Sequence, residues 1–164
     1  MLFKKRLFIV LSFIALNSFA QTAINNENED HDHHEEHRNH IGLAVGPVYV
    51  LHEEEYAPGL HFHYMYLFQV ANTEFGIGLG LESILDEHRH YATSINLSYL
   101  PIHNLTLTVS PGIQFGPDVE EFTSHFEASY EFNFGEIHLG PVLEYAYAKD
   151  DEHAMLGLHV GFGF

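Results

Sequence analysis

The sequence contains no cysteine and few basic residues. Without cysteine, neither a disulfide-stabilised scaffold nor a lipid anchor on an N-terminal cysteine is available. Six lysine and arginine residues stand against 23 aspartate and glutamate residues. Because a nucleic-acid-binding surface must neutralise phosphates, we expect no nucleic-acid partner.

Long apolar runs are also scarce, and the one candidate lies in the first 20 residues. A basic start at residues 4–6 precedes an apolar run at 7–16, and small residues follow up to Ala20. This order is typical of a signal peptide, so we predict export and cleavage after Ala20. The alternative, a membrane-anchor helix, requires about 20 apolar residues, and this run is shorter.

Residues 21–40 are polar and lack an apolar period, which predicts a disordered leader. The leader is rich in acidic residues and in histidine, with His31, His33, His34, His37 and His40. Neutral imidazole is a good ligand for Zn²⁺, Cu²⁺ and Ni²⁺, so this tract is a candidate metal-binding segment. The alternative is a solvated polar tether.

From Ile41 onward, apolar and polar residues alternate with a period of two, which is the pattern of β-strands. Eight segments show it: 41–51, 59–69, 75–85, 91–100, 105–116, 123–134, 137–148 and 154–164. Each is close to the 9–11 residues with which a tilted strand crosses a bilayer. Residues 41–164 are therefore predicted to form one all-β domain.

The two faces of these strands differ in size as well as polarity. In the last segment, Leu156, Leu158, Val160, Phe162 and Phe164 share one face, while glycines and His159 share the other. The interior of an eight-stranded barrel is too narrow for so many large apolar side chains. We therefore predict an antiparallel up-and-down transmembrane β-barrel with its apolar face toward lipid. The alternative is a soluble lipocalin-like barrel or a sandwich with that face inward.

Three prolines, Pro47, Pro111 and Pro141, fall inside predicted strands, and each has a glycine neighbour. Proline cannot donate a hydrogen bond to the ladder, so we expect local β-bulges at these positions.

The connections between the strands form two sets of different charge. One alternate set carries eleven carboxylates and the other only two. An even number of strands puts both ends of the barrel segment on the side of the second set. Short turns face the periplasm in bacterial barrels, so we predict a periplasmic leader and outward acidic loops.

The signal peptide, the eight strands and the terminal alternation ending at Phe164 resemble the small outer-membrane barrels of the OmpA/OmpX-like type. The resemblance covers roughly residues 41–164. It implies insertion into the outer membrane of a Gram-negative bacterium, with outer-membrane lipid, the export system and the barrel-insertion machinery as partners. It carries over no active site.

Inward-facing ionisable residues mark the lumen as a second candidate metal site. His61 and His63 share a face, and four residues on other strands fall at similar heights: Glu82, His125, Glu127 and Glu144. These six residues need not form a single cluster. The alternative is a hydrogen-bonded polar core without an ion. His138 and His159 are expected lower in the lumen, paired with Glu131 or a serine.

A third candidate is the acidic rim, where divalent cations would relieve repulsion between carboxylates; solvated loops are the alternative.

An enzyme has little support. Ser124 and His125 are adjacent but face opposite sides, and no oxyanion-hole motif accompanies them or Ser129. We therefore predict a non-enzymatic barrel that binds or senses divalent transition metals, with Zn²⁺ the leading candidate. The alternatives are a purely structural envelope barrel and a lipid-modifying enzyme.

Overall fold

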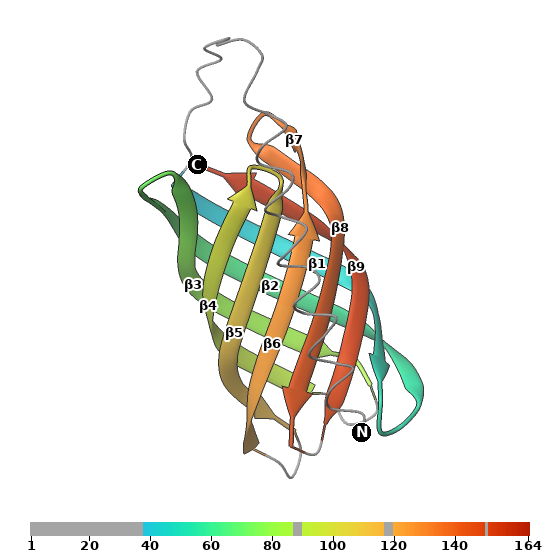
Figure 1. The fold of residues 1–164 in the computed structure, drawn as a ribbon. Coiled ribbons are helices and arrows are strands. Elements are labelled where there is room, and N and C mark those ends of the chain that lie inside the picture. The colour runs from blue at the N-terminus through green and yellow to red at the C-terminus, as the bar shows by residue number, and fades with distance from the viewer. Residues whose placement is uncertain (1–37, 87–89, 117–119, 150) are drawn as a thin grey trace, which may run out of the picture. The chain divides into compact units, whose positions relative to one another are not determined.

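The computed structural model describes residues 38–86, 90–116, 120–149 and 151–164, which form a closed antiparallel barrel (Figure 1). Its strands are β1 (Asn39–Val50), β2 (Glu55–Val70), β3 (Thr73–Ile84), β4 (His90–Ile102), β5 (Leu105–Phe115), β6 (Glu120–Tyr130), β7 (Phe132–Phe134), β8 (Ile137–Ala148) and β9 (Glu152–Gly163). None of the described residues belongs to a helix long and apolar enough to cross a membrane.

From β1 to β6 each strand pairs with the next along the chain, β6 and β7 both pair with β8, β8 pairs with β9, and β9 pairs with β1 to close the barrel. The short β7 continues β6, because both pair with β8 in one unbroken register from Ser129↔Val142 to Phe132↔Leu139. Pairing lapses between them opposite Pro141, which has no N–H to donate. The described residues thus form an eight-stranded barrel, which confirms the predicted fold class.

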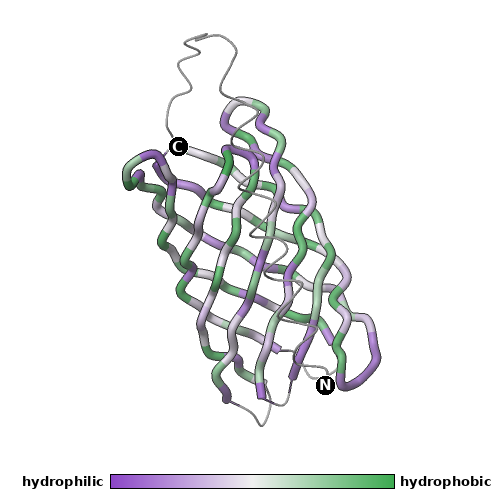
Figure 2. The backbone as a smooth tube through the Cα atoms, viewed as in Figure 1, coloured by the Kyte–Doolittle hydropathy of each residue, from purple (hydrophilic) through white to green (hydrophobic). Residues whose placement is uncertain are grey.

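The large apolar side chains point out of the barrel, and small or polar ones fill it. Along each strand the hydropathy alternates from residue to residue (Figure 2). Leu79 is 63% exposed and Leu156 65%, whereas His159 and Ala44 are completely buried. A soluble barrel with the apolar face inward is therefore wrong for this chain. Lipid is the environment that suits a closed barrel with an apolar exterior.

The bulges predicted at the three prolines are absent, and that prediction was wrong. The register is continuous on both sides of Pro47, Pro111 and Pro141. At Pro47, for example, β1 stays paired with β2, while only the pairs facing β9 lapse locally. A missing donor thus weakens one side of the ladder without requiring an extra residue. The one register shift recorded among the described strands lies between Tyr99 and Ile102.

The first strand begins at Asn39, two residues earlier than predicted. His40 is therefore a barrel residue, and its assignment to the leader was wrong. The predicted signal peptide, and the leader up to residue 37 with its other four histidines, lie outside the described residues.

Candidate metal sites in the barrel lumen

The lumen is lined by buried polar side chains because every second residue of each strand faces inward. The buried polar and charged residues include His40, His61, His63, Asn96, Gln114, His125, Glu127, Glu144, His153 and His159. An eight-stranded barrel has no room for a water-filled pore, so these groups must contact one another. They gather into two groups at different heights.

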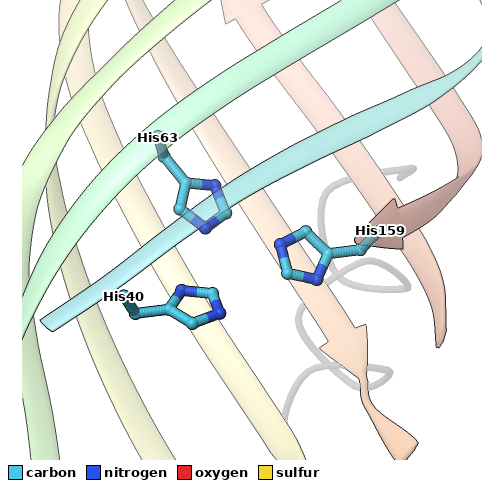
Figure 3. A group of neighbouring side chains, drawn as sticks. All are labelled: His40, His63 and His159. Carbon is cyan, nitrogen blue, oxygen red and sulfur yellow. The ribbon is translucent and has the colours of Figure 1, made fainter. Parts of the chain in front are cut away.

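The first group, the three-histidine site, contains His40 of β1, His63 of β2 and His159 of β9. Strand β1 lies between β2 and β9, and the register sets Gly42 beside His63 and Ala44 beside His159. One ring nitrogen from each histidine lies within 4.8 Å of the other two. The rings enclose a common space near the barrel end where β1 begins (Figure 3).

Five of the six ring nitrogens of this site form no hydrogen bond in the protein. Both ring nitrogens of His40 and of His159, and Nε2 of His63, are buried and form no hydrogen bond. The rings of His63 and His159 stack with their centroids 5.1 Å apart. A carboxylate oxygen of Glu131 approaches Nδ1 of His159 to 3.4 Å. Leaving several buried polar atoms unsatisfied is costly, so this site is adapted to something other than internal hydrogen bonding.

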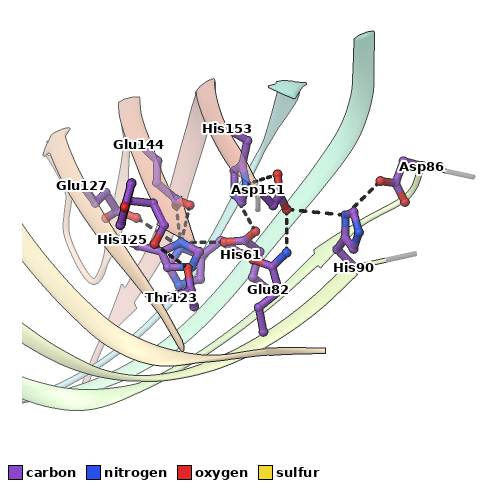
Figure 4. A network of polar contacts seen from close by, with 12 residues as sticks. His61, Glu82, Asp86, His90, Thr123, His125, Glu127, Glu144, Asp151 and His153 are labelled. Carbon is purple, nitrogen blue, oxygen red and sulfur yellow. Dashed lines mark hydrogen bonds and ion pairs between the residues drawn. The ribbon is translucent and has the colours of Figure 1, made fainter. Parts of the chain in front are cut away.

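The second group, the His/Glu network, lies nearer the opposite end of the barrel (Figure 4). It consists of His61 of β2, Glu82 of β3, His125 and Glu127 of β6, Glu144 of β8, and His153 of β9. The register places them at similar heights along the barrel axis, because His61 is opposite Glu82 and Glu127 is opposite Glu144. All six side chains are at most 9% exposed.

Glu144 is at the centre of the His/Glu network. Its Oε1 lies 2.8 Å from Nδ1 of His125, and its Oε2 lies 2.9 Å from Nδ1 of His61. The second carboxylate, Glu82, contacts the same Nδ1 of His125 at 2.8 Å. Nε2 of His153 lies 3.0 Å from the other oxygen of Glu82. Glu127 completes the network, with Oε2 3.4 Å from Nδ1 of His61.

Asp151 extends the network toward the loops. Its Oδ1 lies 3.7 Å from Nδ1 of His153, and its Oδ2 accepts a hydrogen bond from Nε2 of Gln114. Burial alone would raise the pKa of Asp151, but the nearby His153 and the hydrogen bond from Gln114 outweigh it and hold this pKa below the usual value. Asp151 and His90 also line a cavity of about 110 Å³ at this end of the barrel.

The structure brings most of the predicted lumenal residues together. His61, Glu82, His125, Glu127 and Glu144 meet in the His/Glu network, as their predicted heights indicated. His63 does not join them. Its ring centroid lies 5.9 Å from that of His61, but it belongs to the three-histidine site.

Sequence reasoning missed two participants and misplaced a third. His153 was placed in an acidic loop, and His159 was expected to pair with Glu131 or a serine. His40 was predicted as a metal ligand, but as part of the leader. The pairing of His159 and His138 with Glu131 is confirmed, at 3.4 and 3.9 Å. The alternation along the strand could have identified His153. It is six residues from His159, and residues an even number apart on one strand share a face.

Comparison with known protein families and with curated proteins finds no match. Solved structures do match. Ail, the attachment invasion locus protein of Yersinia pestis, is 14% identical, and the match covers 77% of this chain and 97% of that one, with a TM-score of 0.56. Neisserial surface protein A is 11% identical over 77% and 97%, with a TM-score of 0.54. A de novo designed transmembrane β-barrel is 14% identical over 78% and 98%, with a TM-score of 0.53. At these identities the likeness concerns the fold alone, and that fold is the eight-stranded barrel of small outer-membrane proteins.

Proposed function

We propose that this chain is a non-enzymatic β-barrel of the Gram-negative outer membrane that binds a divalent transition metal ion at the three-histidine site. An apolar outer surface and the barrel fold shared with Ail and Neisserial surface protein A support the location. Export and barrel-insertion machinery would deliver the chain, and outer-membrane lipid would surround it.

One observation carries the metal assignment: three buried histidines turn ring nitrogens without protein partners toward one another. Nitrogen ligands of this kind suit Zn²⁺, Cu²⁺ and Ni²⁺. A tetrahedral Zn²⁺ with Zn–N bonds of 2.0–2.1 Å sets its nitrogens about 3.4 Å apart. Donor atoms that already lie within 4.8 Å of one another need only small side-chain rotations to reach that geometry.

A carboxylate behind one ligand is a second supporting feature. Metal-binding histidines usually donate their other N–H to an oxygen acceptor, which fixes the ring and raises its basicity. Oε1 of Glu131, 3.4 Å from Nδ1 of His159, is placed to do this when Nε2 of His159 binds the ion. Water would complete the coordination.

The histidine-rich leader has a place in the same proposal. His31, His33, His34 and His37 precede β1 by only a few residues. In the proposed topology the leader is periplasmic, and its imidazoles and carboxylates would collect ions weakly in the periplasm. A flexible tract binds ions without a fixed coordination geometry. The leader would therefore increase the number of ions bound without selecting one metal over another.

Calorimetric titration of Zn²⁺ into the full chain, refolded in detergent micelles, tests the proposal. We expect a tight site that disappears in His63→Ala and in His159→Gln. It should persist in His52→Ala, which removes an exposed histidine at the far end of the barrel. Replacing the four leader histidines by alanine should remove only weak binding. Circular dichroism verifies that each variant folds.

Two outcomes would contradict the proposal. The first is the absence of binding heat from the unaltered chain, which would leave a purely structural barrel. The second is that folded His63→Ala and His159→Gln bind as many Zn²⁺ ions tightly as the unaltered chain does.

A further inference from the structure

The His/Glu network contains more carboxylate oxygens than its imidazoles can satisfy. Oε2 of Glu82 and Oε1 of Glu144 both lie 2.8 Å from the single Nδ1 of His125. One imidazole nitrogen carries at most one proton, so it cannot donate a strong hydrogen bond to both. The same competition occurs at Nδ1 of His61, which is 2.9 Å from Glu144 and 3.4 Å from Glu127.

Two of these carboxylates are also direct neighbours across strands. Glu127 of β6 and Glu144 of β8 are paired residues, and they are 8% and 2% exposed. Like charges directly opposite each other destabilise a sheet, and burial removes the water that would screen them. Such a pair calls for additional positive charge between or beside the two carboxylates.

The geometry points to a carboxylate-bridged pair of divalent metal ions, and we propose that Glu144 is the bridge. One ion would be held by Glu82, His125, His153 and Oε1 of Glu144, whose donor atoms lie within 4.8 Å of one another. The second would be held by His61, Glu127 and Oε2 of Glu144, which satisfy the same limit. Ions in two-metal sites lie about 3.5–4 Å apart, which is the separation that one bridging carboxylate allows.

The surroundings of the ligands fit this assignment. Nε2 of His125, the nitrogen that would not bind metal, lies 3.3 Å from Oγ1 of Thr123. Nδ1 of His153, also turned away from its ion, lies 3.7 Å from Asp151. Hydroxyl or carboxylate partners on the outer nitrogen are the usual support of metal-bound imidazole.

The mixed donor set defines the class of ion. Three carboxylates and three imidazoles favour divalent first-row ions that accept both oxygen and nitrogen, such as Mn²⁺, Fe²⁺, Co²⁺ and Zn²⁺. The three-histidine site offers nitrogen alone. The two-metal centre uses none of that site's residues and therefore does not depend on the proposed function. Asp151, which lies 3.7 Å from the proposed ligand His153, also lines the cavity of about 110 Å³ at the loop end.

Electron paramagnetic resonance of the full chain in detergent, titrated with Mn²⁺ alone, tests the proposal. We expect an exchange-coupled signal from two ions. Glu144→Gln should abolish the coupling. Glu127→Gln, which removes a ligand at the edge of the centre, should leave one uncoupled ion. Glu136→Gln, which alters an exposed turn, is the matched control and should retain the coupled signal.

His63→Ala should also retain it, which separates this centre from the three-histidine site. If folded wild-type chain binds no Mn²⁺, or binds only uncoupled ions, the two-metal centre is wrong. Coupling that survives in Glu144→Gln would rule out Glu144 as the bridge.

Discussion

Gly42 of β1 and His159 of the neighbouring β9 are so close that a Cβ on Gly42 would lie 2.3 Å from Nε2 of His159. The same Cβ would lie 2.4 Å from Nε2 of His63. A glycine on the middle strand therefore creates the space into which the two neighbouring strands turn their imidazoles. Gly161 does the same for His40, whose Nε2 would lie 2.3 Å from a Cβ at that position.

Gly42→Ala should therefore abolish tight Zn²⁺ binding at the three-histidine site although all three histidines remain. The added methyl group meets the ends of flexible side chains, which can rotate away, so we expect the barrel to fold with the imidazoles displaced. Calorimetry measures the affinity and circular dichroism the fold. Gly116→Ala, at the other end of the barrel, is the control for affinity, because a Cβ there would come no closer than 3.3 Å to another side chain. Undiminished Zn²⁺ affinity in a folded Gly42→Ala variant would argue against ligation inside the lumen.

The outward apolar face predicts a large cost for a charge facing lipid. Leu79 lies near the middle of β3 and points outward. Leu79→Arg should lower the free energy of unfolding in lipid vesicles by about 2–4 kcal/mol if it is at the bilayer midplane. Leu79→Ala, measured in the same urea titration, separates the charge from the lost side-chain volume. An arginine that costs no more than the alanine would contradict a membrane location for this face.

The proposed supporting role of Thr123 predicts a graded effect on the two-metal centre. Thr123→Ala should reduce Mn²⁺ affinity about 10–100-fold, as is common when the outer partner of a ligand is removed, without changing the number of ions bound. Thr73→Ala, at the start of β3 and outside the network, is the matched control. A fall in the number of ions, with the affinity of the remainder unchanged, would contradict this role.

Metal should stabilise wild type more than it stabilises Glu144→Gln. Without metal, Glu144→Gln loses the contacts of the carboxylate with His61 and His125 as well as the repulsion from Glu127, so the metal-free stability of each protein is the baseline for its own metal effect. With Mn²⁺ at 100 times its dissociation constant, a single site stabilises wild type by about 2.7 kcal/mol. Thermal unfolding with and without a chelator measures both states. A wild type that metal leaves unchanged would count against the lumenal sites.

Much of the barrel was predictable from the sequence because the strand period is simple. Alternation assigns each side chain to the inside or the outside, and it correctly placed Glu82, His125 and Glu144 in the lumen. The contrast between large and small faces also indicated which side would meet lipid. Both inferences depend only on residue parity and on the narrow interior of an eight-stranded barrel.

The incorrect placements of residues came from the ends of the strands and from the displacement of the strands along the barrel axis. His40 and His153 lie at strand ends, where a shift of two residues changes a loop residue into a lumenal one. The separation of His63 from His61 depends on how far each strand is displaced along the axis relative to its neighbours. That displacement is fixed by the closed hydrogen-bond register, which the sequence pattern alone does not specify.

The three-histidine site lies where the barrel closes. His40 belongs to the first strand and His159 to the last, and the adjoining Asn39 and Phe164 exchange backbone hydrogen bonds of 3.0 and 2.9 Å. An incomplete sheet, in which these two strands have not yet met, cannot assemble the ligands. An ion bound here would therefore hold the first and last strands together, and its binding would indicate that the barrel has closed.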